Sequence, residues 1–372
     1  MADSFSNPDF CASFREVLLQ WYQGHRRALP WRENRDPYRI WISEMILQQT
    51  RIDQGLPYFE RFIAAFPNVE ALAAAPLDDV LKVWEGLGYY ARARNLHRAA
   101  RMIVEEHNGR IPDTMEEISK LPGIGPYTAA AVLSIAYNRD HPVVDGNVIR
   151  VLCRLCKIRE DPRNTATKRE LLRIAEHLLP EGKASDFNQA MMELGSLVCT
   201  PRNPQCPECP VGEFCRARHL EDPSILPVKI RKPKRPHYDV TAGIIRGQDG
   251  RILLAQRPAS GLLGGLWEFP GGKQESDESL EECLKRELRE ELRIEVRVDE
   301  RLPSVKHAYS HFAITLHGFA CTHLSGEPQA IDCADWRWIR PEELTNFALP
   351  RADRKLLDAM RGDGVQFELF GQ

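Results

Sequence analysis

The chain has 372 residues, of which 43% are hydrophobic and 28% are charged, and its formal net charge is −3 at pH 7. Such a length is enough for about two or three domains with their own cores, and the near-neutral balance excludes a polyelectrolyte that coats nucleic acid without specificity. Because residues 1–10 do not resemble a signal peptide and no apolar run approaches the length of a membrane span, we expect a cytoplasmic protein that binds no membrane.

From about residue 10 to residue 220 the pattern predicts an almost wholly helical region. Apolar residues recur at spacings of three and four, and Gly and Pro separate the segments. The clearest segments are 14–22, 40–50, 58–66, 77–87 and 93–107. Arg92, Arg94, Arg98 and Arg101 form a basic group that suits either a phosphate contact or a solvated helix face.

A Gly-x-Gly turn at Gly123 and Gly125 interrupts this helical pattern and restarts it at once. The first backbone N–H groups of a helix have no helical partner, so they can bind an anion such as a DNA phosphate. Asp145 follows Gly125 by 20 positions, and one helix and one loop can bring it to face the hairpin. A lone turn of this kind is usually an ordinary connection, but Pro122, Pro126 and the spaced Asp145 favour a functional hairpin.

Four of the ten cysteines crowd into one short, Pro-rich segment. They are Cys199, Cys206, Cys209 and Cys215. Four thiolates so close together repel one another unless a metal centre takes up their charge, and the ligand type alone allows zinc or an iron–sulfur cluster. Cys153 and Cys156 instead have helical spacing among apolar residues, which predicts a place in the core.

The chain changes character after residue 220. Residues 221–237 are rich in Pro and basic residues and predict an extended linker. Its basic residues are Lys229, Arg231, Lys232, Lys234 and Arg235. The apolar period then becomes two, with a hairpin predicted over 239–258, one helix over 278–292, and strands within 305–321 and 334–339. We therefore predict three parts: a helical domain over 1–220, the linker over 221–237, and an α+β domain over 238–372.

Two carboxylic acids are the candidates for chemistry. Glu44 lies among apolar residues that would raise its pKa and keep its proton available near neutral pH. These neighbours are Trp41, Ile42, Met45 and Ile46. Asp145 is the candidate anion. A proton donor and an anion on opposite sides of a sugar are what cleavage of a glycosidic bond requires, although an isolated Glu on a helix usually faces solvent.

Residues 31–50, 84–96 and 121–131, together with the cysteine segment, resemble adenine DNA glycosylases of the MutY type, which belong to the endonuclease III-like, helix-hairpin-helix superfamily. The resemblance runs from about Leu29 to the cysteines and implies that these hold a [4Fe–4S] cluster. It also implies that Glu44 protonates the adenine and that Asp145 either stabilises or captures the sugar cation.

The resemblance assigns two further residues to this chemistry. Tyr127 stands where bifunctional relatives have a Schiff-base lysine, so no efficient β-elimination is expected. We predict a hydrogen bond from its hydroxyl to Asp145. Asn147 is predicted to cap the next helix and to position Asp145 or its water.

The same resemblance implies that adenine is flipped out of the duplex into this site. Gln49 and Tyr89 would fill or wedge the stack of DNA bases near the partner base. Leu87 and Gly88 would shape the turn that carries Tyr89. Trp31 and Arg32 are expected to line the base pocket, with Arg27 and Gln189 as weaker candidates. The implied partner is double-stranded DNA with adenine opposite 8-oxoguanine or guanine, bound by a monomer.

Residues 238–372 resemble the MutT-like C-terminal domain of the same family, which reads 8-oxoguanine. The residues that would do so are Tyr309, Ser310 and His311. This region also nearly fits the Nudix box, a helix whose carboxylates can hold Mg²⁺ against a diphosphate. Gly272, Glu278, Arg286, Glu287, Glu290 and Glu291 are in register. Arg293 replaces the glycine that ends the box, which puts the metal-site geometry in doubt.

The sequence therefore predicts a multi-domain protein with an all-α helix-hairpin-helix glycosylase domain, an iron–sulfur loop, and an α+β MutT/Nudix-like domain. The predicted activity is monofunctional removal of adenine opposite 8-oxoguanine. One alternative is a pyrimidine glycosylase and lyase of the endonuclease III type. Another is a Nudix nucleotide hydrolase whose helical domain only binds nucleic acid, and a third is a protein that binds mismatches without chemistry.

Overall fold

A computed structural model describes residues 7–228 and 235–362. Four basic residues of the predicted linker, Lys229, Arg231, Lys232 and Lys234, lie outside the described residues. The chain forms two compact units whose residues contact one another mainly within the unit. The helical unit is Met1–Ala73 with Arg98–Lys232, and the sheet unit is Ala74–His97 with Pro233–Gln372. This division does not follow chain order, so the domain bounds that we inferred from the sequence stay a prediction.

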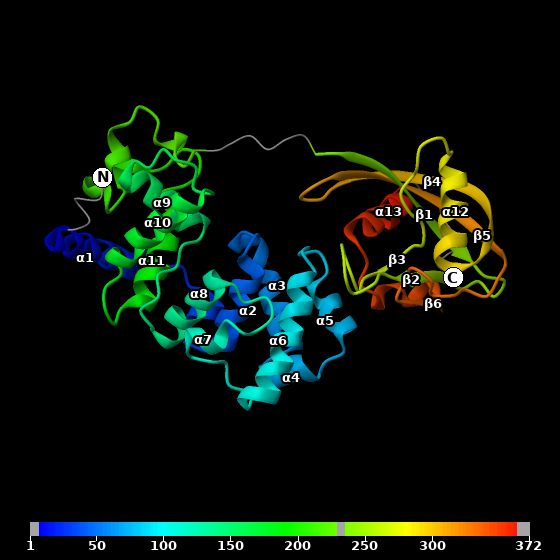
Figure 1. Ribbon diagram of the computed structural model, residues 1–372, viewed down its shortest axis with the longest axis horizontal. Coiled ribbons are helices and arrows are strands. Elements are labelled where there is room, and N and C mark those ends of the chain that lie inside the picture. Colours follow the sequence, from blue (N-terminus) through cyan, green and yellow to red (C-terminus); the bar gives the residue numbers. More distant parts are fainter. Residues whose placement is uncertain (1–6, 229–234, 363–372) are drawn as a thin grey trace. The chain divides into compact units, whose positions relative to one another are not determined.

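Helices make up the chain from residue 8 to residue 197, and each predicted helical segment lies mostly within one of them (Figure 1). In order they are α1 Pro8–His25, α2 Pro37–Leu47, α3 Ile52–Ala65, α4 Val69–Ala74, α5 Leu77–Trp84, α6 Ala91–His107, α7 Met115–Ile118, α8 Pro126–Tyr137, α9 Gly146–Cys156, α10 Thr165–Leu178 and α11 Ala184–Leu197. Among the described residues, none of the helices is long and apolar enough to cross a membrane.

Two helices of the helical unit are buried almost all round. Residues 40–46 of α2 and 128–136 of α8 are all buried, and a helix that is apolar on every side belongs in the centre of a domain. A second core joins α1, α9, α10 and α11 around Phe14 and Leu152. Cys153 is fully buried in this core and Cys156 packs against it, which confirms the predicted core position.

The sheet unit combines one mixed sheet with two longer helices (Figure 1). Its later elements are β1 His237–Arg246, β2 Ile252–Gln256, β3 Trp267–Glu268, α12 Leu280–Leu292, β4 Glu295–Ala308, β5 Ala313–Ser325, β6 Asp335–Ile339 and α13 Arg351–Gly362. The strand order is β3-β2-β1-β5-β4, with β6 paired to β2, and only the β1–β5 pairing is parallel among the pairs of the described strands. The predicted β1–β2 hairpin and the α+β fold are confirmed.

Both faces of the sheet are covered because alternate residues of a strand point to opposite sides. Ile244 of β1 packs in the core that contains Leu356 of α13. The next residue, Ile245, packs in the core that contains Leu284 of α12. The sequence pattern predicted α12 two residues too early, since Ser279 caps the helix and accepts a hydrogen bond from the N–H of Glu282. The strand β3 and the helix α13 were not predicted.

Arg293 stands at the end of α12, at the position where the Nudix box has a glycine. Arg293 is the C-cap residue and is held in the left-handed conformation at φ 58° and ψ 34°, which costs a residue with a Cβ about 1–2 kcal/mol. Its side chain is exposed. We predict that Arg293→Gly raises the free energy of unfolding of the sheet unit by about 0.5–1 kcal/mol, because the unfolded-state entropy of glycine offsets part of the gain.

Scanning calorimetry of the full chain would measure this change as a rise in the midpoint temperature of one unfolding transition. Arg293→Ala is the matched control, since alanine also carries a Cβ and gains nothing in the left-handed region. Equal midpoints for the glycine and alanine variants would contradict the prediction.

Candidate active site and iron–sulfur loop

A cavity of about 610 Å³ in the helical unit collects most of the predicted site residues. Those that line it are Arg27, Trp31, Arg32, Glu44, Gln49, Tyr127, Asp145, Asn147 and Gln189. They come from α2, α8, α9, α11 and the chain before and after α2. The tertiary fold thus joins segments that are more than a hundred residues apart in sequence.

Glu44 lies in the buried part of α2, and its exposed fraction is 8%. The Tyr127 hydroxyl donates a hydrogen bond to its Oε2 at 2.7 Å. Burial raises the pKa of Glu44 to about 7, with a smaller rise from Asp145, while the bond from Tyr127 and the charge of Arg32 oppose the rise. Glu44 can therefore carry a proton near neutral pH. The prediction that Tyr127 binds Asp145 is wrong, because the hydroxyl contacts the other carboxyl group of the site.

Asp145 is itself the N-cap residue of α9. Its Oδ1 accepts the Val148 N–H at 2.7 Å, and its Oδ2 accepts the Asn147 side-chain amide at 2.9 Å. Asn147 lies inside α9, so the prediction that it caps the helix is wrong, although it does position Asp145. Burial raises the pKa of Asp145, and these hydrogen bonds and the charge of Arg150 act against that rise by favouring the carboxylate.

Arg150 was missed by the sequence analysis. It is 9% exposed, and its Nη2 donates to Asn147 Oδ1 at 2.8 Å and to the Gly195 carbonyl at 2.7 Å. Its Nε donates to the Cys199 carbonyl at 2.7 Å. The spacing of three residues from Asn147 to Arg150 on one helix was the available signal, because such pairs share a face.

Glu193 was missed as well. It lies on α11 with 1% exposed, lines the cavity, and accepts hydrogen bonds from Arg27 and Arg32. A single acidic residue within the otherwise apolar stretch 190–194 could have indicated it, because a buried carboxylate needs cationic partners.

The four cysteines of the predicted cluster line one small cavity. Arg154 of α9 reaches the same place, where its Nη1 lies 3.2 Å from Cys199 Sγ. Among the residues that the structure describes, no group of three or more His, Cys, Asp or Glu is placed to hold a single metal ion. Four cysteine thiolates in one cavity are the ligand set that an iron–sulfur cluster takes.

The hairpin glycines lie in an exposed turn before α8. Gly123 has φ +79°, and Gly125 is the N-cap residue of α8 without a capping side chain. A Cβ on Gly125 would meet nothing within 4 Å. The backbone is therefore open at the start of α8, where unpaired N–H groups can receive an anion, but neither glycine lines the cavity that holds Glu44.

In the sheet unit, Tyr309, Ser310 and His311 form the tip between β4 and β5, as predicted. The Tyr309 ring packs on Phe312 with the centroids 4.9 Å apart, while Ser310 and His311 are exposed. Tyr89 Oη and Ser310 Oγ share a hydrogen bond. The sheet unit therefore brings together two residues that the sequence assigned to DNA recognition separately.

The turn before α6 presents Tyr89 to solvent. Gly88 has φ +72° and Tyr89 has φ +50°, and the Tyr89 side chain is 45% exposed. Leu87 precedes them and is half-buried. Arg92 lies over the rings of Trp84 and Tyr89, each at 5.4 Å, so it contributes to packing and not only to a solvated basic face.

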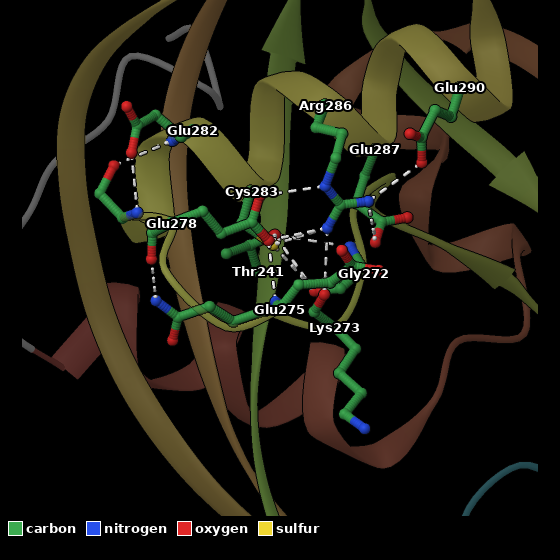
Figure 2. Close-up of polar contacts among 12 residues, drawn as sticks. Thr241, Gly272, Lys273, Glu275, Glu278, Glu282, Cys283, Arg286, Glu287 and Glu290 are labelled. Carbon is green, nitrogen blue, oxygen red and sulfur yellow. Dashed lines mark hydrogen bonds and ion pairs between the residues drawn. The ribbon is translucent and has the colours of Figure 1, made fainter.

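Three carboxylates of the predicted Nudix box surround the guanidinium of Arg286, as Figure 2 shows. Arg286 donates to Glu278 through Nη2 at 2.8 Å and to Glu287 and Glu290 through Nη1, both at 3.0 Å. Gly272 lies close to this network, since a Cβ there would stand 2.2 Å from the Glu287 carboxyl carbon and would displace that side chain. Glu278, Glu287 and Glu290 of the box are thus paired with Arg286.

Three family models match the chain. Residues 42–177 match the HhH-GPD superfamily of base excision DNA repair proteins, residues 199–215 match the iron–sulfur binding domain of endonuclease III, and residues 241–359 match the NUDIX domain. The helical part is also similar to the solved structure of a thermostable thymine-DNA glycosylase, at a TM-score of 0.50 and 30% identity over 56% of this chain and 95% of that chain.

Two curated relatives extend over nearly the whole chain. The adenine DNA glycosylase of Mus musculus is 36% identical over 95% of this chain and 78% of its own length. The adenine DNA glycosylase of Homo sapiens is 34% identical over 94% of this chain and 74% of its own length. The chain therefore belongs to the adenine DNA glycosylase family, and it is a base excision repair enzyme with an iron–sulfur binding domain and a Nudix domain.

Proposed function

We propose that this DNA glycosylase removes adenine from positions opposite 8-oxoguanine, and more slowly opposite guanine, and leaves an abasic site. The observation that carries the proposal is the pair of carboxyl groups in one cavity. Glu44 is buried with a pKa of about 7, and Asp145 is hydrogen-bonded in the manner of a carboxylate.

The two groups meet the two demands of the reaction. Adenine is a poor leaving group until a ring nitrogen is protonated, and Glu44 supplies that proton. The departing sugar develops positive charge, and Asp145 meets it either as an electrostatic stabiliser or as a nucleophile that captures the cation. The adenine reaches the cavity only after it is flipped out of the duplex.

Tyr127 supports a monofunctional enzyme. It occupies the hairpin helix position nearest to Glu44 and cannot form an imine with the sugar. No lysine lines the cavity among the residues that the structure describes. The Tyr127 hydroxyl instead orients the Glu44 carboxyl group through its hydrogen bond.

Recognition of the lesion falls to the sheet unit in this proposal. Ser310 and His311 are exposed at the tip of the β4–β5 hairpin, and Ser310 is bonded to Tyr89. Their donors and acceptors suit the altered edge of 8-oxoguanine, while Gln49, at the mouth of the cavity, would fill the space left by the flipped base. The Nudix helix serves as scaffold in this proposal, since Arg286 pairs with Glu278, Glu287 and Glu290.

We further propose that the cluster is a [4Fe–4S] centre held by Cys199, Cys206, Cys209 and Cys215. When bound, it neutralises the four thiolates and fixes the loop. Arg216 and Arg218 follow the last cysteine in that loop, at positions from which they can meet a DNA phosphate.

Strand analysis under single-turnover conditions tests the proposed activity. A duplex with adenine opposite 8-oxoguanine should break only after treatment with alkali, and faster than a duplex with adenine opposite guanine. Breakage without alkali would instead identify a lyase, and intact strands in both samples would refute the proposed activity. A duplex with thymine opposite 8-oxoguanine is the negative control.

The pKa of Glu44 predicts the pH dependence of base removal. Because the protonated form is the proton donor, the rate should be highest below the pKa and should fall as the pH rises through about 7. Glu44→Gln should lower the single-turnover rate by about 10²–10⁴-fold while duplex binding, measured by anisotropy, stays nearly the same. Glu60→Gln, an exposed change on α3, is the control, and an unchanged rate in the Glu44 variant would refute the assignment.

Metal analysis tests the cluster. We expect about four irons per chain with acid-labile sulfide, a broad visible absorbance, and no stoichiometric zinc. Cys206→Ser should lose iron and thermal stability together, whereas Cys333→Ser, which changes a half-buried thiol of the sheet unit, should keep both. Stoichiometric zinc in place of iron would overturn the assignment.

A further inference from the structure

Glu193 makes an unusually complete set of hydrogen bonds for a buried carboxylate. It accepts from the backbone N–H of Arg27 at 3.0 Å and from Arg27 Nε and Nη2, both at 2.8 Å. It also accepts from Arg32 Nη1 at 3.2 Å and Nη2 at 3.0 Å. Burial opposes ionisation of Glu193, but these bonds outweigh it and hold its pKa at about 2, so the group is an anion at neutral pH.

The two arginines form a wall between two cavities. Both line the cavity of about 610 Å³ that contains Glu44, and both line a neighbouring cavity of about 390 Å³. Trp31 also lines both cavities. Arg32 Nη1 donates in addition to the Arg27 carbonyl at 3.2 Å, so the two side chains form one unit.

Two guanidinium groups in one wall repel each other unless an anion lies between them. Glu193 is that anion and approaches both from α11. Its exposed fraction of 1% means that water cannot replace it, and loss of one partner of a buried ion pair leaves the others uncompensated. The position of α11 thus decides where Arg27 and Arg32 stand in the cavity.

We propose that Glu193 is a positioning residue for adenine removal, which fixes Arg27 and Arg32 as one wall of the base pocket and balances their charge across the cavity from Glu44. This inference rests on the proposed function. It assigns a role to α11, which lies between the residue ranges that the family models match.

The positive charges of Arg27 and Arg32 connect Glu193 to Glu44, the proposed proton donor. Arg32 lowers the pKa of Glu44, and Glu193 compensates part of the Arg32 charge through two hydrogen bonds. The charged and titratable groups that line the cavity with Glu44 are Arg27, Arg32, Arg51, Asp53, Tyr127, Asp145, Arg150 and Glu193. Removing the Glu193 charge should therefore favour ionised Glu44 and move the loss of activity to lower pH.

The test compares Glu193→Gln with Glu193→Asp in the full chain loaded with its cluster. Glutamine has the same shape without the charge, whereas aspartate keeps the charge on a shorter side chain. Glu268→Gln is the matched control, because Glu268 also pairs with an arginine, Arg257 at 2.8 Å, but lies in the sheet unit. Single-turnover adenine excision is measured against pH and normalised to active enzyme by titration with duplex.

We expect Glu193→Gln to slow excision about tenfold at neutral pH, the effect of losing one charge-assisted contact, and to shift the alkaline limb of the profile to lower pH. Glu193→Asp should restore the position of that limb, though not the full rate. Glu268→Gln should leave the profile unchanged. A Glu193→Gln variant that keeps the unmodified profile and rate per active molecule, even with a lower melting temperature, would overturn the proposal.

A second measurement does not depend on activity. Carbon-13 NMR of the labelled glutamate carboxyl groups, with Glu44→Gln to assign the signal, gives the pKa of Glu44 in the absence of DNA. A lower pKa in Glu193→Gln supports the positioning role even if the unmodified protein removes no adenine, in which case the proposed function alone fails. An unchanged pKa refutes the charge balance.

Discussion

The cavity of the helical unit contains a buried carboxyl group, that of Glu44, which accepts a hydrogen bond from the neutral hydroxyl of Tyr127. Ionised Glu44 would be costly in that position, so burial keeps its proton near neutral pH. Burial raises the pKa of Asp145 as well, but there the start of α9 and Asn147 supply N–H donors to both carboxyl oxygens and oppose the rise. The two chemically similar carboxyl groups therefore differ in the hydrogen bonds that they accept.

Helix α9 connects this cavity to the iron–sulfur loop. Its first turn holds Asp145, Arg150 one turn later donates to the Cys199 carbonyl, and Arg154 reaches the Cys199 sulfur. Helix α11 approaches α9 closely at Gly195, where a Cβ would stand 2.7 Å from the Asn147 Cβ. The loop that carries the cysteines and the residues that position the carboxylate are consequently parts of one packed structure.

The sheet unit carries polar residues both around α12 and at the β4–β5 hairpin tip. Residues along each strand alternate between a face covered by α12 and a face covered by α13. Glu287 and Glu290 of α12, together with Glu278 before it, pair with Arg286. Ser310 and His311 lie exposed at the hairpin tip. A charge network that is satisfied within the protein stabilises a helix and needs no ligand to do so.

The sequence alone determined the helical segments, the change to strand periodicity, the cysteine loop and both carboxyl groups, because these depend on local spacing and residue type. It did not determine which side chains meet. The partner of Tyr127 is Glu44 and not Asp145, and the partners of Glu193 stand more than 160 positions away. Only the packing of α2, α8, α9 and α11 decided these contacts, since hydrogen bonds between distant segments follow from how buried helices approach one another and leave no periodic signal in the chain.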